Sequence, residues 1–123
     1  MSGFTTAVDG RGVATVLIDN PPINLFSVEL FLGLAAEFEQ LASDDAVRVV
    51  VLRSANPKWF IAHFDVEAIR GFPLDQPPAT ELNSFHVMCE TLRTMPKATI
   101  AVIEGRVGGG GSELTLSCDM RFG

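Results

Sequence analysis

The chain has 123 residues and a formal net charge of −6, and 47% of its residues are hydrophobic. This length fits one domain or part of a larger one, and its scattered basic residues argue against nucleic-acid binding, which needs clustered Lys and Arg. No apolar run approaches the roughly 20 residues of a membrane span, and we expect no signal peptide and no membrane partner. Cys89 and Cys118 match no disulfide framework or metal motif, so we expect two reduced thiols in a cytoplasmic protein without bound metal.

The first half of the chain alternates between strand and helix patterns. Residues 4–8 and 13–18 are predicted strands joined by a hairpin, and Asn-Pro-Pro at 20–22 breaks the regular structure. The nearly continuous β-branched run at 47–52 predicts a strand covered on both faces. Between them, Ser27 is a predicted N-cap for a helix whose apolar stripe consists of Leu30, Phe31, Leu34, Ala35, Phe38 and Leu41.

The second half continues this alternation. A short helix is predicted over 65–70, followed by a proline-rich irregular loop over 71–79. Residues 98–103 form a further predicted buried strand. Thr80 is predicted to cap a long helix that ends at Pro96, with an apolar stripe of Leu82, Phe85, Cys89 and Leu92 and with Met88 and Met95 beside it.

The predicted order of strand, helix, strand, helix and strand is typical of an α/β fold. Right-handed crossovers would make the connected strands parallel. After the last of these strands, 112–118 is predicted to form a short helix, and 119–122 begins another extended segment.

A glycine-rich segment, residues 105–113, connects the strand at 98–103 to this helix. Glycines at such a junction leave N–H groups unpaired, which favours binding of an anion or a developing negative charge. A phosphate loop would need a lysine that is absent, and Val107 or Glu113 breaks a dinucleotide fingerprint. A transient oxyanion beside a proton-moving Glu113 fits the segment better. The alternative is that the glycines only allow close packing and that Glu113 complements the helix dipole.

The glycine segment and the stretches around it resemble the crotonase family, which includes enoyl-CoA hydratases and isomerases. The resemblance covers nearly the whole chain in the family's order. The similar segments are 22–27 (Pro-Ile-Asn-Leu-Phe-Ser), the strand at 47–53, 60–65 (Phe-Ile-Ala-His-Phe-Asp), the strand at 95–105, 109–114 (Gly-Gly-Gly-Ser-Glu-Leu) and 118–121 (Cys-Asp-Met-Arg).

The resemblance implies a fold and an assembly. The fold would be the crotonase-like spiral of ββα units, and residues 1–123 would be a partial domain, the N-terminal core of that spiral. It would be truncated and lack the C-terminal helical trimerisation region. The full-length parent would be a homotrimer or hexamer.

The resemblance also implies site residues. The backbone N–H groups of Phe64 and Gly110 would form an oxyanion hole for the thioester oxygen of an acyl-CoA substrate. Glu113 matches the first of two catalytic glutamates, and the second lies beyond residue 123. No metal is implied, and no cofactor apart from the coenzyme A of the substrate. The residues implied to bind substrate are Ala62, Phe64, Asp65, Val66, Glu67, Gly109 and Gly110.

The implied activity is enoyl-CoA hydration, the addition of water across a double bond conjugated to the thioester. The alternatives are an isomerase or another crotonase reaction, and a catalytically incomplete acyl-CoA-binding or assembly protein. His63 stands where the family usually has glycine, and it would be costly there if the position needs a positive φ. Phe64 replaces a small residue, and its ring would narrow the acyl pocket. Candidates for contacting the CoA phosphates are Lys58, Arg53 and Lys97.

Overall fold

A five-stranded sheet organises the computed structural model, which describes residues 3–123. Its strand order is β1-β2-β3-β5-β7, in which β1 (Phe4–Val8) and β2 (Val13–Ile18) form an antiparallel hairpin. β2, β3 (Val49–Ser54), β5 (Ala98–Val102) and β7 (Met120–Phe122) are parallel. The predicted hairpin, the parallel pairing and the α/β class are therefore confirmed.

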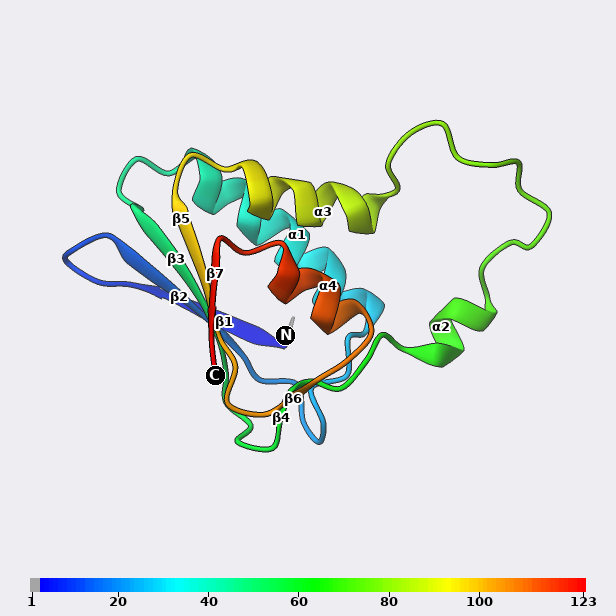
Figure 1. Cartoon of the computed structure of the whole chain (residues 1–123), viewed down its shortest axis with the longest axis horizontal. Coiled ribbons are helices and arrows are strands. Elements are labelled where there is room, and N and C mark those ends of the chain that lie inside the picture. The colour runs from blue at the N-terminus through cyan, green and yellow to red at the C-terminus, as the bar shows by residue number, and fades with distance from the viewer. Residues whose placement is uncertain (1–2) are drawn as a thin grey trace.

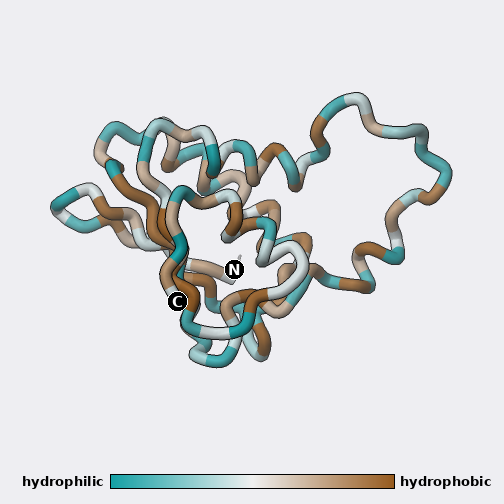
Figure 2. The backbone as a smooth tube through the Cα atoms, viewed as in Figure 1, coloured by the Kyte–Doolittle hydropathy of each residue, from teal (hydrophilic) through white to brown (hydrophobic). Residues whose placement is uncertain are grey.

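Three helices cover one face of this sheet (Figure 1). They are α1 (Val28–Ser43), α3 (Ser84–Thr94) and α4 (Gly110–Leu116). Ser27 caps α1 as predicted, because its side chain accepts a hydrogen bond from the Leu30 N–H at 3.1 Å. Figure 2 shows apolar residues concentrated along the strands. The side chains that fill the space between sheet and helices are fully buried, and they include Ala14, Val16, Ile18, Leu30, Leu34, Phe38, Val50, Leu52, Leu92, Ala101 and Leu114.

The strand predicted at 47–52 begins and ends two residues later than expected, as β3. The expectation that both of its faces are covered is wrong for this chain. Val50 and Leu52 face the helices and are fully buried, whereas Val49 and Val51 on the other face are only half-buried. A run of β-branched residues does not distinguish a fully covered strand from one with a half-exposed face.

Two helix boundaries also differ from the sequence prediction. α3 begins at Ser84 rather than after Thr80, because the side chain of Asn83 caps it by accepting from the His86 N–H at 2.9 Å. Leu82, predicted to be part of the buried stripe, is 59% exposed in the preceding loop. α4 begins at Gly110, two residues before the predicted start, so the helix starts inside the glycine run.

A second, two-stranded sheet was not predicted. It pairs β4 (Trp59–Ile61) with β6 (Arg106–Val107) in parallel, at one end of the main sheet (Figure 1). These strands are too short to show a hydrophobic period. α2 (Val66–Arg70) follows β4, within the predicted 65–70 segment, and the chain then runs through a long irregular loop to α3. The loop stands off from the helical layer as an arch.

A reciprocal pair of hydrogen bonds fixes the start of β7 beside β5. The Thr99 N–H donates to the Asp119 carboxylate, and the Asp119 N–H donates to the Thr99 hydroxyl, both at 2.9 Å. Thr99 is fully buried, so these bonds satisfy polar groups that water does not reach. The same carboxylate therefore sets the register in which the segment after α4 rejoins the main sheet.

Candidate active site

The turn at Phe64 is attached to the chain entering α1. Phe26 forms an isolated parallel bridge with Phe64, in which the Phe26 N–H donates to the His63 carbonyl and the Asp65 N–H donates to the Phe26 carbonyl, each at 2.9 Å. Backbone groups of successive residues in an extended segment point to opposite sides. The Phe64 N–H therefore points away from Phe26.

The glycine turn lies against this segment. Gly109 has φ 51° and ψ −128°, a conformation that side-chain-bearing residues rarely adopt. A Cβ placed on Gly109 would lie 3.4 Å from the His63 Cβ and 3.7 Å from the Phe64 nitrogen. A side chain on Gly109 would therefore contact His63 and the Phe64 nitrogen, and the glycine turn lies close to the turn at Phe64.

The four consecutive glycines have different roles. A Cβ on Gly108 would lie 2.6 Å from the Ala62 carbonyl oxygen, and one on Gly111 would lie 2.7 Å from the Ile61 Cβ. These two glycines permit the close approach of the turn to β4, so the packing alternative holds for them. Gly109 supplies the positive φ, and Gly110 begins α4 beneath the rings of Phe85 and Phe26.

The amides of Phe64 and Gly110 have no hydrogen-bond acceptor within residues 3–123, whereas the amides that follow Gly110 do. The Gly111 N–H donates to the Gly108 carbonyl and the Ser112 N–H to the Gly109 carbonyl, both at 3.0 Å. A free donor at the first residue of a helix is usual. The second free donor, Phe64, lies on a different turn, and an oxyanion hole needs two such donors that converge on one oxygen.

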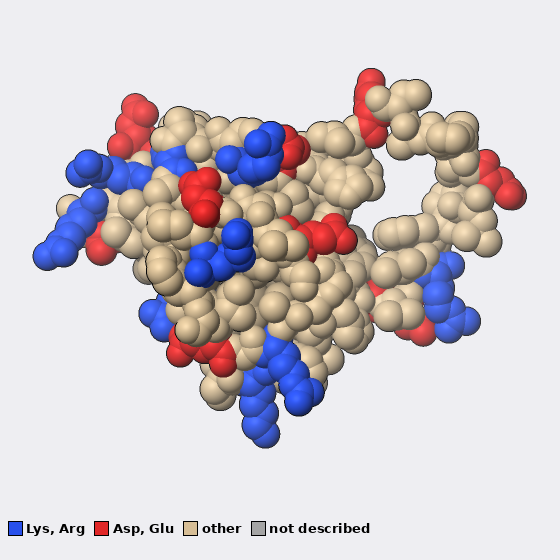
Figure 3. Space-filling model, viewed as in Figure 1, with Lys and Arg blue, Asp and Glu red and all other residues tan. Residues whose placement is uncertain are grey.

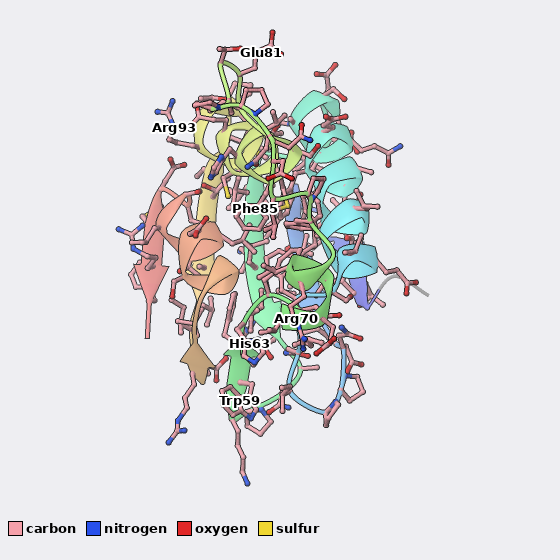
Figure 4. All side chains as sticks on the ribbon, turned by 90° about the vertical axis from the view of Figure 1, so that its right-hand side faces the viewer. Trp59, His63, Arg70, Glu81, Phe85 and Arg93 are labelled. Carbon is pink, nitrogen blue, oxygen red and sulfur yellow. The ribbon has the colours of Figure 1, made fainter. Side chains whose placement is uncertain are left out.

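Both residues line one cavity of about 720 Å³. Figure 4 looks onto this side of the molecule and shows Phe85 and His63 in the space framed by α4 on one side and by α1 and α2 on the other. The wall is mostly apolar, as expected for a site that holds an acyl chain. The lining residues are Phe31, His63, Phe64, Val66, Ile69, Phe72, Pro73, Asn83, Ser84, Phe85, Gly109, Gly110 and Glu113.

Glu113 is exposed in the first turn of α4 and contributes the one carboxylate among these lining residues. Its side chain makes no hydrogen bond and no ion pair with any residue that the structure describes. A carboxylate without a fixed partner is free to accept and return a proton within the cavity.

His63 occupies its position without backbone strain. Among the described non-glycine residues only Asn24 has a positive φ, so the cost considered for histidine here does not arise. The His63 Nδ1 lies 2.8 Å from the Phe64 carbonyl oxygen. Because a carbonyl oxygen can only accept, Nδ1 carries a proton in this contact.

The residues implied to bind substrate divide into two groups. Val66 and Gly109 line the cavity, together with Phe64, Gly110 and Glu113. Three others do not: Ala62 is buried against the glycine turn, Asp65 caps α2 through the Glu67 N–H at 3.0 Å, and Glu67 pairs with Arg70 at 3.3 Å. The structure therefore gives Asp65 and Glu67 contacts that stabilise α2.

The three basic candidates for the CoA phosphates lie outside the cavity wall. The Lys97 ammonium donates to the carbonyls of Leu41 and Asp44, and so caps the C-terminus of α1. Arg53 forms an ion pair with Glu104 at 2.6 Å. Lys58 lies in an exposed turn beside a smaller, separate pocket. Figure 3 shows Lys and Arg distributed over several parts of the visible face.

Sequence reasoning placed Phe31 and Phe85 in the buried stripes of their helices and missed that both line the cavity. An apolar stripe shows which face of a helix packs against the protein, but it does not show which residues of that face border a cavity. Phe60 is fully buried core, whereas Trp59 is half-buried and lies under the Arg106 guanidinium at 5.8 Å. Neither of these two aromatic residues is a wall of the cavity.

Sequence reasoning also missed the role of Asn24, a buried residue whose side-chain hydrogen bonds support the segment leading to Phe64. Its side-chain amide donates to the Ser54 hydroxyl at 2.7 Å and to the Trp59 and Phe60 carbonyls at 3.2 and 3.0 Å. Its side-chain carbonyl accepts from the Asn20 N–H at 2.8 Å. These bonds connect the loop before α1 to β4, the strand that leads into the turn.

The two cysteines do not line the cavity. Burial raises the pKa of the Cys118 thiol to about 12, and burial is also the main cause that raises the pKa of the half-buried Cys89. Both are free thiols. Across residues 3–123, no cluster of three metal-ligating side chains occurs, and no helix is long and apolar enough to cross a bilayer.

Comparisons with known proteins match this arrangement. The chain is 34% identical over 112 residues to the Arabidopsis thaliana protein named "probable enoyl-CoA hydratase 2, mitochondrial", a match that covers 90% of this chain and 37% of that relative. It is 29% identical over 118 residues to the peroxisomal fatty acid beta-oxidation multifunctional protein MFP2 of the same plant, covering 94% of this chain and 16% of that protein. The solved structure of an enoyl-CoA hydratase/carnithine racemase from Magnetospirillum magneticum matches with a TM-score of 0.80 and 29% identity, over 98% of this chain and 46% of that one.

The chain thus spans less than half the length of each of these proteins. The model of the enoyl-CoA hydratase/isomerase family matches residues 9–122, which include both turns, Glu113 and all the strands of the main sheet except β1. The fold is that of the crotonase group, and the chain belongs to the enoyl-CoA hydratase/isomerase family.

Proposed function

We propose that this chain supplies the oxyanion hole and one acid–base carboxylate of an enzyme that hydrates enoyl-CoA thioesters. The observation that supports the proposal is that Phe64 and Gly110, whose amides have no acceptor among the described residues, line one apolar cavity together with Glu113. The two amides would donate to the thioester oxygen. That oxygen gains negative charge as the substrate becomes enolate-like, so fixed donors stabilise the transition state more than the ground state.

Glu113 would move the protons of this reaction. Its carboxylate takes a proton from a water molecule as the water oxygen bonds to C3 of the enoyl group. The electrons of the double bond pass towards the thioester oxygen and give the enolate. The enolate then collapses as C2 takes up the proton that Glu113 had accepted, which restores the carboxylate, and the hydroxyacyl thioester leaves with one water added. A general acid–base group contributes about 10²–10⁴-fold to such a rate.

Crotonyl-CoA tests this proposal, because hydration removes the absorbance of its conjugated thioester. We expect turnover by the wild-type protein and a loss of about 10²–10⁴-fold in kcat for Glu113→Gln, which keeps the shape but not the base. Glu104→Gln is the matched control, since Glu104 is an exposed glutamate that pairs with Arg53 away from the cavity. Equal loss in both variants, or no effect of either, would refute the assigned role.

A second candidate is a protein that binds acyl-CoA without turning it over. Glu113 is the one carboxylate among the residues that line the cavity, and this favours binding alone if no second acid–base group joins it. Binding of crotonyl-CoA without any loss of absorbance would select this candidate. Isomerisation by the same enolate would instead produce a shifted double bond and no hydroxyacyl product. Assembly as a homotrimer or hexamer and a cytoplasmic location stay predictions.

A further inference from the structure

The ring of Phe64 lies at the centre of a cluster of phenylalanines. Its centroid is 5.8 Å from that of Phe26, 6.1 Å from Phe85, 6.3 Å from Phe31 and 6.5 Å from Phe72. These rings come from the chain before α1, from α3, from α1 itself and from the start of the arch. Tilted and edge-on contacts at such distances are favourable, so the Phe64 ring is held from several sides.

The cluster runs from the core to the cavity mouth. Phe26 is fully buried and Phe31 is 9% exposed, whereas Phe72 at the other end is 52% exposed. Phe64 and Phe85 lie between them, partly buried and on the cavity wall. The Phe64 ring therefore separates packed core from open cavity, and it is not simply part of the core.

This placement gives Phe64 two roles, one for its backbone amide and one for its ring. The Phe64 backbone N–H is one of the two proposed anchors for the thioester oxygen, so the acyl group must begin beside this residue. The ring of the same residue projects into the apolar cluster that forms the wall. Its distance from the anchored oxygen is fixed by covalent geometry and by the contacts with Phe26 and Phe85.

We infer that the Phe64 side chain is a specificity-determining residue that limits the acyl group to short chains. The inference rests on the proposed function, because it needs the thioester to be anchored at the Phe64 amide. Methylene groups beyond the first few would meet the ring and remain in water. Removing the ring would open the space between Phe31, Phe72 and Phe85, which is apolar and suited to a longer chain.

Binding of saturated thioesters, which cannot be hydrated, tests this inference separately from catalysis. Butyryl-CoA, decanoyl-CoA and coenzyme A would be titrated calorimetrically into the wild-type protein, Phe64→Ala and Phe64→Leu. Each buried methylene is worth roughly a fourfold gain in affinity. We expect decanoyl-CoA to bind the wild type no more than about threefold tighter than butyryl-CoA. This ratio should rise by roughly tenfold or more in Phe64→Ala, which frees space for at least two methylenes.

Phe64→Leu protects the test against a folding failure, because leucine keeps most of the apolar contact while shortening the side chain. The ratio of its affinity for decanoyl-CoA to its affinity for butyryl-CoA should rise by roughly fourfold over the wild type, the gain for one methylene. Phe122→Ala is the matched control, since Phe122 is a 58% exposed phenylalanine on β7 that does not line the cavity. Its ratio should equal that of the wild type.

The outcomes separate the two proposals. If the wild type and the Phe64 variants bind both thioesters no better than coenzyme A alone, the acyl-CoA function fails, and the inference fails with it. If the thioesters bind but the ratio in Phe64→Leu and Phe64→Ala matches that of Phe122→Ala, only the inference about Phe64 is overturned. A raised ratio in either Phe64 variant, with no change in Phe122→Ala, supports it.

Discussion

Replacing Gly108 with alanine should separate the two turns on which the site depends. The Gly108 N–H donates to the Ile61 carbonyl at 3.0 Å, and the added Cβ would lie 2.6 Å from the Ala62 carbonyl oxygen. Ordinary van der Waals contact begins at 3.4 Å, so the difference, 3.4 − 2.6, requires a movement of 0.8 Å. Because the position of a Cβ is fixed by its own backbone and the Ala62 oxygen is a backbone atom, no side-chain rotation can relieve the contact.

The cost should be a large part of the protein's stability. Overpacking typically destabilises a protein by about 1–3 kcal/mol, and a clash between two backbones belongs at the upper end. For a domain of this size each kcal/mol lowers Tm by about 3–6 °C, so Gly108→Ala should melt roughly 10 °C below the wild type. Gly10→Ala is the matched control, since a Cβ there meets nothing within 4 Å and φ is not positive. It should be neutral or stabilise by about 0.5 kcal/mol.

The substitution should also reduce any enoyl-CoA hydratase activity. The movement widens the gap between β4 and the glycine turn, and it therefore displaces the Phe64 amide relative to Gly110. A misplacement of this size can cost about 10²-fold in rate. Thermal melts by circular dichroism and kcat with crotonyl-CoA, measured well below both transitions, check the two effects. A Gly108→Ala protein that melts with the Gly10→Ala control would show that the close approach inferred from the structure is not present.

Two further substitutions test the scaffold. Asn24→Ala should lower the free energy of unfolding by about 3 kcal/mol, because it leaves the buried Phe60 carbonyl without its donor and the Asn20 N–H without its acceptor. Denaturant titration measures this loss, and the exposed N-cap change Asn83→Ala should cost only about 1 kcal/mol. Equal costs would contradict the role given to Asn24. The raised pKa of Cys118 favours the protonated thiol in the folded state, so the stability it contributes is complete below pH 9.0 and is lost as the pH rises towards about 12. The decline should be about 1.4 kcal/mol per pH unit in that range and should be smaller in Cys118→Ala, and a parallel decline in both proteins would exclude this cause.

Local sequence patterns were sufficient for most of the fold. The apolar stripe after Ser27 repeats over several helical turns, and the β-branched runs extend over whole strands. These patterns therefore predicted α1, β3 and β5 to within two residues. The start of α3 was placed too early because Thr80 and Asn83 are both acceptable caps. In the structure the Asn83 side chain makes the capping hydrogen bond with the His86 N–H, which fixes the start of the helix. The strands β4 and β6 are too short for any period, and they form because the glycines near them let two backbones approach closely.

The sequence by itself determined the identity of the groups that could act: a glycine turn that leaves an amide free, a carboxylate one turn later, and the family resemblance that links them to residue 64. It could not determine that Phe64 and Gly110 line one cavity, or that Phe31, Phe72 and Phe85 line the same cavity. These residues are far apart along the chain, and no local preference relates them. Only the packing of α1, α3 and the small sheet against the main sheet brings them together. Residues distant in the sequence become neighbours only when all these elements pack closely against each other.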